Sequence, residues 1–438
     1  MNVVQITPGA GSMYCGNCFR DNALVAALRQ MGHSALLVPL YLPMTLEEED
    51  QSAGTPIFFG GINVYLEQKS AFFRHSPKWL HQFFDSRSLL KWAAGRAAKT
   101  RAEDVGDLTL SMFRGEAGNQ ARELDELIAW LKTQPAPEII CLSNALLIGL
   151  VRRLREELRV PVVCMLQGED SFLDSLPAGQ RNAAWQLLAE RAAEVDLFIA
   201  PSRYFGDLMA RRLHLPSARV KVVFNGIHLD GYATVPGSEF RVPSSPTLGY
   251  FARMCREKGL DTLVESFVLL KQRDRVKNLR LRVGGGCGPS DEPFVEQLKQ
   301  RLAAAGVLSD VEFHPNLTRS AKQDFLRSLS VFSVPARYSE AFGLYVIEAL
   351  ASGVPVVQPR ASAFPELVGA TAGGMLCEPD NPASLADALE SLLLNPEQAR
   401  AQGEAGRQAV RRDFNVERMA HNIVNVFQEL CGHVKQPA

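Results

Sequence analysis

Several features that would classify a chain of this length at once are missing from the sequence. No uninterrupted apolar stretch is long enough to cross a bilayer, and the first residues lack the basic start and cleavage site of an export signal. The formal charge of −1 provides no overall attraction to nucleic acid. We therefore expect a cytoplasmic protein without a nucleic-acid partner.

The eight cysteines do not form a metal-binding pattern. Only Cys15 and Cys18 lie close together, and a four-cysteine zinc site would need a second such pair. A redox pair at the start of a helix and two small residues in a tight loop both fit this spacing. The sequence also lacks an Asp-x-Asp motif, which holds a divalent ion on a nucleotide sugar. We expect no metal ion and no bound cofactor.

Two common nucleotide-binding motifs are also missing. After the first predicted strand, Gly9 and Gly11 are followed by Tyr14, so the G-x-G-x-x-G sequence of dehydrogenases is not completed. No G-x-x-x-x-G-K-[ST] sequence occurs, which excludes a P-loop nucleoside triphosphatase. A nucleotide would have to bind through a different motif.

The sequence does contain two successive series of short strands that alternate with helices. The 438 residues, 46% of them hydrophobic, suffice for two domains that each bury a core. Alternation of this kind predicts two Rossmann-like α/β domains, each with a doubly wound parallel sheet. The predicted strands are residues 3–7, 34–40, 138–142, 160–166, 197–200 and 220–223, then 247–251, 279–283, 311–313, 331–334 and 354–357.

The domain limits follow from breaks in this alternation. We expect an N-terminal domain at 1–235, a proline- and glycine-containing linker at 232–245, and a C-terminal domain at 246–414. Residues 41–130 interrupt the first series as an insertion. A last helix is predicted at 415–438, with an apolar stripe at helical spacing: Val416, Met419, Ala420, Ile423, Phe427 and Leu430.

Within the insertion, residues 71–101 combine positive charge with aromatic side chains. Seven Lys and Arg residues stand against one acid, Asp85, and Trp79 and Trp92 lie among them. Such a segment could bind an anionic acceptor or lie peripherally on the inner membrane face. A pair of amphipathic helices with solvated charges fits equally well, so both interpretations stay open.

The most informative segment is residues 338–357, which joins a strand to a helix and to the next strand. Gly343 allows a ligand to approach the backbone, and the helix it opens directs free N–H groups toward a phosphate. Glu348 lies about five residues into this helix, where its carboxylate can accept both hydroxyls of a ribose. Glu340, in the loop before the helix, would lie beyond the phosphate, next to the sugar.

These two glutamates, separated by seven residues, resemble the signature of the retaining glycosyltransferases of family 4. Residues 252–259 are similar to the family segment in which an arginine and a lysine bind the donor diphosphate, here Arg253 and Lys258. Residues 201–202 and 224–227 resemble two further family segments. The resemblance covers the second domain and both ends of the first. It implies the GT-B fold, in which two Rossmann-like domains face a cleft and the last helix crosses back to the N-terminal domain.

The resemblance implies retaining transfer of a hexose-type sugar from a nucleotide-diphosphate sugar. Arg253 and Lys258 would offset the charge on the leaving diphosphate without a metal ion, and Glu340 would complete the catalytic set. The acceptor would be a sugar, a lipid-linked molecule or another small molecule. The expected donor-binding residues are Gly16, Asn17, Gly284, Phe342, Gly343, Leu344 and Glu348, and the expected acceptor-side residues are Gln167, Glu169 and Asp170.

One position departs from the family pattern. Gln167 replaces a common histidine, and glutamine can hydrogen-bond a hydroxyl but cannot accept a proton near neutral pH. Glu169 or Asp170 would then be the side-chain base, unless the leaving phosphate takes the proton. Two alternatives to a transferase stay open: a non-catalytic sugar-nucleotide sensor, and a sugar-phosphate synthase or phosphorylase on the same fold.

Overall fold

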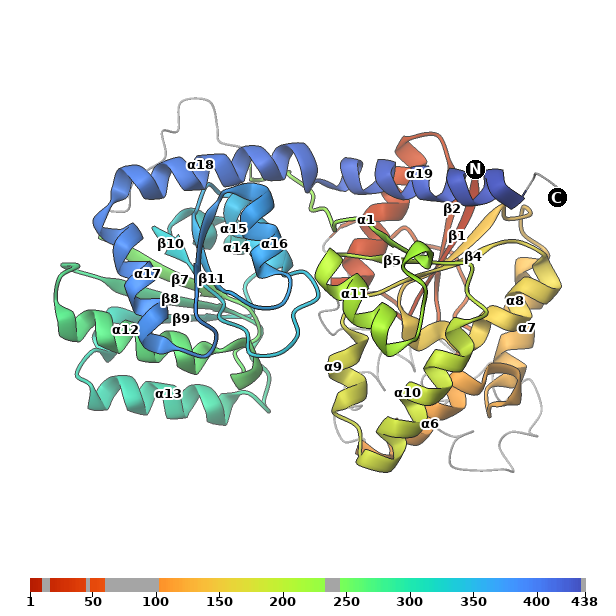
Figure 1. The fold of residues 1–438 in the computed structure, drawn as a ribbon, viewed down its shortest axis with the longest axis horizontal. Coiled ribbons are helices and arrows are strands. Elements are labelled where there is room, and N and C mark those ends of the chain that lie inside the picture. Colours follow the sequence, from red (N-terminus) through yellow and green to blue (C-terminus); the bar gives the residue numbers. More distant parts are fainter. Residues whose placement is uncertain (10–15, 45–47, 60–101, 233–244, 435–438) are drawn as a thin grey trace. The chain divides into compact units, whose positions relative to one another are not determined.

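The computed structural model describes residues 1–9, 16–44, 48–59, 102–232 and 245–434 (Figure 1). The chain forms two compact units: unit 1 is Met1–Phe224 with Met419–Ala438, and unit 2 is Asn225–Arg418. Each unit contains a six-stranded parallel sheet. The sequence predicted a parallel sheet in each domain, with six strands in the first and five in the second. Residues 71–101 and most of the expected linker lie outside the described residues.

The sheet of unit 1 has the strand order β2-β1-β3-β4-β5-β6. From β1 the chain passes to β2 on one side, and from β2 it crosses to β3 on the other side of β1. The topological switch point, where such sheets bind ligands, therefore lies between β1 and β3. The strands are β1 (Asn2–Thr7), β2 (Ser34–Pro39), β3 (Ile139–Leu142), β4 (Val162–Met165), β5 (Leu197–Ala200) and β6 (Val220–Val222).

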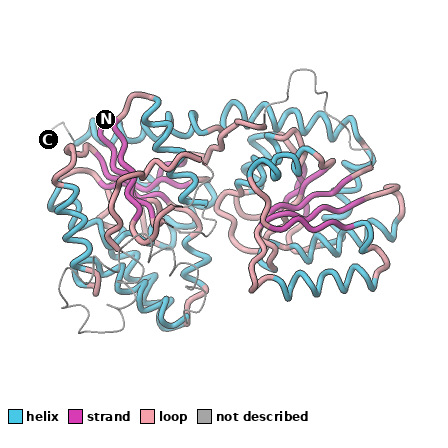
Figure 2. Tube along the Cα trace, turned by 180° about the vertical axis from the view of Figure 1, so that it is seen from behind, coloured by secondary structure: helices cyan, strands magenta, loops and turns pink. Residues whose placement is uncertain are grey.

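Helices cover this sheet, and the strands lie between them in Figure 2. Strands β3, β4 and β5 are buried throughout, as expected for a parallel sheet covered on both faces. The hydroxyl of Ser202 accepts a hydrogen bond from the backbone N–H of Phe205 and so caps α11 directly after β5. The helices are α1 (Gly16–Gln30), α6 (Ala102–Arg114), α7 (Ala121–Leu131), α8 (Val151–Leu158), α9 (Glu169–Asp174), α10 (Ala178–Ala192) and α11 (Arg203–Arg212).

The sheet of unit 2 has the order β12-β11-β10-β7-β8-β9, and its switch point lies between β7 and β10. Its strands are β7 (Thr247–Phe251), β8 (Arg280–Gly285), β9 (Val311–Pro315), β10 (Val331–Phe332), β11 (Val356–Pro359) and β12 (Gly374–Cys377). Its helices are α12 (Leu260–Arg273), α13 (Glu292–Ala304), α14 (Arg319–Arg327), α15 (Leu344–Ala351), α16 (Phe364–Thr371), α17 (Pro382–Leu394) and α18 (Pro396–Asp413).

Strand β12 is absent from the sequence prediction. It follows Gly373 and begins at Gly374, and glycine is unfavourable in strands, so composition gave no signal for it. Gly374 pairs with Val356 of β11 in parallel register. A Cβ atom on Gly374 would collide with the carbonyl oxygen of Val356, so the close approach of the two strands requires glycine here.

The last helix, α19 (Val416–Val434), begins in unit 2 and belongs to unit 1 from Met419 onward, which confirms the predicted crossover. Asn415 caps it by accepting a 2.7 Å hydrogen bond from the N–H of Arg418. Its buried apolar residues are Val416, Met419, Ala420, Ile423, Val424, Val426 and Phe427. In the part of the chain that the structure describes, no helix is long and apolar enough to span a membrane.

Candidate functional site

The charged residues expected at the donor site gather in unit 2 at the carboxyl ends of β7 and β10. Arg253 follows β7 directly, and Lys258 ends a short 3-10 helix, η5 (Arg256–Lys258), that leads into α12. Glu340 lies in the loop between β10 and α15, and Glu348 lies in α15. Because β7 and β10 are hydrogen-bonded neighbours, these loops meet at the switch point.

Glu340 and Lys258 form an ion pair in this site. The distance from Lys258 Nζ to Glu340 Oε2 is 2.6 Å, and the two side chains are 18% and 13% exposed. The same oxygen accepts hydrogen bonds from the hydroxyls of Tyr345 at 2.7 Å and Tyr338 at 3.1 Å. Burial disfavours the carboxylate, but Lys258 and the two hydroxyls together hold the pKa of Glu340 below its ordinary value. Glu340 is therefore ionised at neutral pH.

Backbone contacts hold the loops of Lys258 and Glu340 together. Gly259 has φ +71°, and a Cβ atom there would collide with the carbonyl oxygen of Pro335. The N–H of Arg337 donates to the carbonyl of Glu257 at 2.9 Å. Glycine after Lys258 thus allows η5 to pack against the loop that contains Glu340.

Arg253 is anchored on one side and open on the other. Its Nη2 lies 2.8 Å from Oδ1 of Asp291, and its Nε contacts both oxygens of that carboxylate at 3.0–3.1 Å. Asp291 is buried, which opposes ionisation, but Arg253 and the N–H of Gly288 lower its pKa. The side chain of Arg253 is 60% exposed, and its Nη1 has no hydrogen bond to any described residue. Nη1 is available to a phosphate oxygen.

The start of α15 supplies backbone donors next to these side chains. Gly343 caps the helix with φ +93°, a conformation that few other residues adopt, and Leu344 is the first helical residue. The first N–H groups of a helix have no acceptor within it and favour an anion. The ring of Phe342 is buried against Phe414, with ring centroids 6.3 Å apart.

Glu348 is held by a second lysine. Lys322 Nζ, from α14, lies 2.6 Å from Glu348 Oε1, and both side chains are less than 15% exposed. The ammonium group is also 5.9 Å from the ring centre of Phe251 at the end of β7. Sequence reasoning missed Lys322, because nothing in its own neighbourhood indicates a partner on another helix.

Gly284 is a packing residue inside β8. It is buried, and a Cβ atom on it would press against the ring of Phe251. The exposed part of this turn begins at Gly286. Asn316 clamps the turn, because its side chain accepts a hydrogen bond from the N–H of Cys287 and donates one to the carbonyl of the same residue, both at 3.0 Å.

The expected residues of unit 1 lie at the carboxyl ends of its strands. Gly16 and Asn17 are half-buried in the first turn of α1, whereas Cys15 lies outside the described residues. Gln167 is half-buried after β4, and Asp170 is buried in α9.

Glu169 braces the backbone of unit 1. It is 3% exposed, and its two oxygens accept hydrogen bonds from the N–H groups of Ala145 and Gln167, each at 2.9 Å. Burial raises the pKa of Glu169 despite these bonds. A carboxylate so engaged holds the end of β4 to the loop after β3, and it has little freedom to accept a proton from a substrate.

Sequence reasoning also missed a buried ion pair in α1. Both Nε and Nη2 of Arg20 contact Asp21 Oδ1, and Nη2 donates to the carbonyl of Ser143 at 2.9 Å. The pair ties α1 to the end of β3 at the switch point of unit 1. Two adjacent charges in an apolar helix were the available signal, because such charges are costly to bury unless they are paired.

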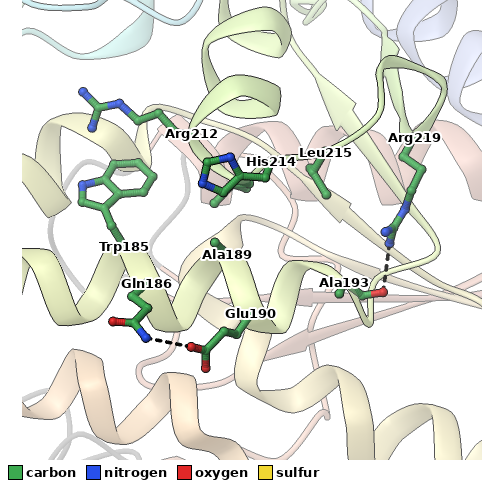
Figure 3. Close-up of a pocket in the computed structure, with 10 residues that line it drawn as sticks. Trp185, Gln186, Ala189, Glu190, Ala193, Arg212, His214, Leu215 and Arg219 are labelled. Carbon is green, nitrogen blue, oxygen red and sulfur yellow. Dashed lines mark hydrogen bonds between the residues drawn. The ribbon is translucent and has the colours of Figure 1, made fainter.

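A surface hollow of about 550 Å³ lies on unit 1, away from these loops (Figure 3). The end of α10 and the segment after α11 line it, and they lead into the amino ends of β5 and β6. Arg212 stacks on Trp185, with its guanidinium carbon 4.6 Å from the ring centre. The hollow is therefore at the opposite edge of the sheet from Gln167.

The residues that the structure describes offer no cluster of metal-binding side chains. No three His, Cys, Asp or Glu side chains are placed there to hold a metal ion together. Most of the described cysteines are buried.

Comparison with known proteins supports the family resemblance. The sequence matches the family model "Glycosyl transferases group 1" over residues 237–409 and the model "Glycosyltransferase Family 4" over residues 93–230. Two curated relatives are the lipopolysaccharide core biosynthesis mannosyltransferase LpsB of Rhizobium meliloti and the D-inositol 3-phosphate glycosyltransferase of Streptomyces griseus. The chain is 31% identical to the first over 193 residues, and 30% identical to the second over 231 residues.

The match to the first relative covers 43% of this chain and 53% of that relative. The match to the second covers 48% of this chain and 49% of that relative. The chain thus spans about half the length of the curated relatives it matches. The solved structure of the Anabaena protein HepE in complex with UDP is 15% identical, with a TM-score of 0.69 that covers 98% of this chain and 100% of that one. The chain belongs to the family 4 glycosyltransferases, and its two doubly wound units have the GT-B fold.

Proposed function

We propose that the protein transfers a hexose from a nucleotide-diphosphate sugar to an acceptor, with retention of configuration and without a metal ion. The observation that supports this most is the cluster at the switch point of unit 2. There an outward Nη1 of Arg253, the ammonium of Lys258 and the start of α15 converge from neighbouring loops. Such a set of donors suits a diphosphate, and two fixed carboxylates lie within the same segment.

Each residue has a distinct role in this proposal. Arg253, Lys258 and the first N–H groups of α15 bind the diphosphate and offset its charge as the donor bond breaks. Glu348 accepts the ribose hydroxyls, and Glu340 accepts a hydroxyl of the transferred sugar. The bond from the anomeric carbon to the phosphate oxygen breaks, and the acceptor oxygen bonds to that carbon on the same face. The acceptor proton passes to the leaving phosphate oxygen, so Gln167 need not act as a base.

We assign the choice of acceptor to unit 1, since the donor residues lie in unit 2. The curated name of one relative contains an inositol phosphate, and that of another a lipopolysaccharide core. An anionic small molecule or a lipid-linked sugar is therefore the class to test first. Residues 71–101, outside the described residues, supply the positive charge that such an acceptor or an anionic membrane would meet.

The test begins with thermal shifts for UDP, GDP and ADP in the presence of EDTA. The solved complex of HepE makes UDP the first choice. The sugar donor of the base that binds is then incubated with the protein, and NMR reports the anomeric configuration of the released or transferred sugar. Retention in EDTA supports the proposal. Inversion, or a requirement for a divalent ion, contradicts it, and binding without any turnover indicates a sugar-nucleotide sensor.

A further inference from the structure

We propose that Tyr345 and Tyr338 are positioning residues that fix Glu340 and Lys258 as one unit and leave a single carboxylate oxygen of Glu340 for the donor sugar. This inference rests on the proposed function and adds two residues to its machinery.

All three donors converge on the same oxygen of Glu340. Oε2 accepts from Lys258 at 2.6 Å, from Tyr345 at 2.7 Å and from Tyr338 at 3.1 Å. No described residue donates to Oε1, although the side chain keeps 13% of its surface exposed. Three donors saturate one oxygen and fix the plane of the carboxylate. Oε1 is then the acceptor that a sugar hydroxyl can reach.

The same two rings hold Lys258. Its Nζ lies 4.7 Å from the ring centre of Tyr338 and 4.9 Å from that of Tyr345, within the range of cation–π attraction. The ammonium group of Lys258 thus contacts two aromatic rings and the carboxylate of Glu340. An ammonium has three N–H donors, and the bond to Glu340 uses one of them. The others are available to a phosphate oxygen, so Lys258 can bind the diphosphate without leaving Glu340.

The phenols are suited to a fixed role because they do not titrate near neutral pH. Burial raises the pKa of both Tyr338 and Tyr345 far above the ordinary value. Each hydroxyl therefore keeps its proton and remains a donor at any pH at which the protein works. When a diphosphate attracts part of the charge of Lys258, the two hydroxyls continue to stabilise the carboxylate of Glu340.

Tyr345 and Tyr338 reach this oxygen from different elements. Tyr345 is the second residue of α15, and Tyr338 lies in the loop before it. The ring of Tyr345 also packs at 6.4 Å from those of Phe332 and Phe364, which limits its rotation. A ring held by the core and a hydroxyl directed at a carboxylate are the features expected of a residue that sets the position of another.

The experiment compares Tyr345→Phe and Tyr338→Phe, which keep the rings and remove the hydroxyls. Tyr250→Phe is the matched control, because Tyr250 is a buried tyrosine of the same unit whose hydroxyl donates at 2.7 Å to the carbonyl of Arg253 and not to Glu340. Two measurements are made: the donor kcat and KM over a pH series, and the titration of Glu340 by carboxyl ¹³C NMR, assigned with Glu340→Gln.

We expect Tyr345→Phe to lower kcat about tenfold with little change in the donor KM, since one hydrogen bond to a charged group is lost. The effect of Tyr338→Phe should be smaller, because its bond is longer. Both variants should raise the pKa of Glu340 and move the acid limb of the rate profile to higher pH, whereas Tyr250→Phe should leave both unchanged. A titration of Glu340 in Tyr345→Phe identical to wild type overturns the inference. If the wild type turns over no donor, the function fails, while the NMR titration still decides the role of the tyrosines.

Discussion

Each unit places a buried glutamate after a strand of its parallel sheet, and the two units use this glutamate differently. Glu169 follows β4 of unit 1, and both of its oxygens accept backbone N–H groups. Glu340 follows β10 of unit 2, and one of its oxygens accepts only side-chain donors, from Lys258 and two tyrosines. The pKa of Glu169 is raised by burial, whereas that of Glu340 is lowered by its partners.

This difference indicates which carboxylate can do chemistry. A glutamate bonded to backbone on both oxygens shapes a loop and has no position left for a ligand. A glutamate held on one oxygen by side chains is fixed and charged, and its second oxygen stays accessible. We therefore expect substitutions in unit 2 to affect turnover first, and substitutions in unit 1 to affect stability first.

The largest effect is expected for Lys258→Ala. It removes a charge that offsets the leaving diphosphate, so kcat should fall by about 10²–10³ while the fold persists. The control is Lys277→Ala, because Lys277 is an exposed lysine of the same unit that pairs with Asp274. Donor turnover, measured by release of the nucleoside diphosphate, decides the result. Near-normal turnover in Lys258→Ala would show that Lys258 does not act in the donor site.

Phe427→Ala tests the other side of the comparison. Phe427 is fully buried in the part of α19 that belongs to unit 1, and truncation of a buried phenylalanine costs about 3–5 kcal/mol. Urea unfolding should show this loss, whereas affinity of unit 2 for a nucleoside diphosphate should hold. Glu429→Ala, on the exposed face of the same helix, serves as the control. If Phe427→Ala lost as much nucleotide affinity as Glu348→Ala, the proposed division, with stability in unit 1 and nucleotide binding in unit 2, would be wrong.

The two motif glutamates should separate binding from transfer within unit 2. Glu348→Ala should weaken nucleoside diphosphate binding about 10–100-fold, because its proposed partner is the ribose. Glu340→Ala should leave this affinity near that of the wild type and impair sugar transfer. Calorimetry on both variants provides the test. Equal losses of affinity would show that the two roles are wrongly assigned.

The smallest effect is a pair of opposite pH dependences in the free energy of unfolding. The pKa of Glu340 is lowered on folding, so its stabilisation is present above about 4.5 and is lost as the pH falls through the lowered value. The pKa of Glu169 is raised, so its contribution is present below about 4.5 and is lost as the pH rises through the raised value.

Urea unfolding of Glu340→Gln and Glu169→Gln between pH 3 and 8, each beside the wild type, tests these signs. The stability difference between wild type and Glu340→Gln should narrow on acidification. The difference for Glu169→Gln should narrow as the pH rises. If both stability differences changed in the same direction with pH, the contrast between Glu340 and Glu169 would be contradicted.

The sequence predicted the elements with strong apolar patterns and missed contacts between elements. All the predicted strands are present. Those buried throughout, such as β3, β4 and β5, gave continuous apolar segments because a parallel sheet is covered on both faces. Strand β12 was missed because close packing required glycine at its start. Lys322 and Asp291 were missed for another reason: they lie 26 and 38 residues from Glu348 and Arg253, and only the fold brings them together.

Tyr345 shows a different limit. It lies inside the motif that was identified from the sequence, only five residues after Glu340. An aromatic residue in a short helix usually indicates a core position, and the ring of Tyr345 does pack in the core. The direction of its hydroxyl depends on the turn at Gly343, which a pattern of residue types does not specify.

The backbone pairing at the base of α19 has a consequence for how this architecture can be divided. The chain enters unit 2 at Asn225 and leaves it at Arg418, and Ile227 bonds to Phe414 at 3.0 Å and to Val416 at 3.2 Å across these two connections. Unit 2 therefore has its ends side by side, in the manner of an inserted domain. Such a segment can be exchanged as a whole at a single junction, which would replace the proposed donor site while the proposed acceptor side in unit 1 is retained.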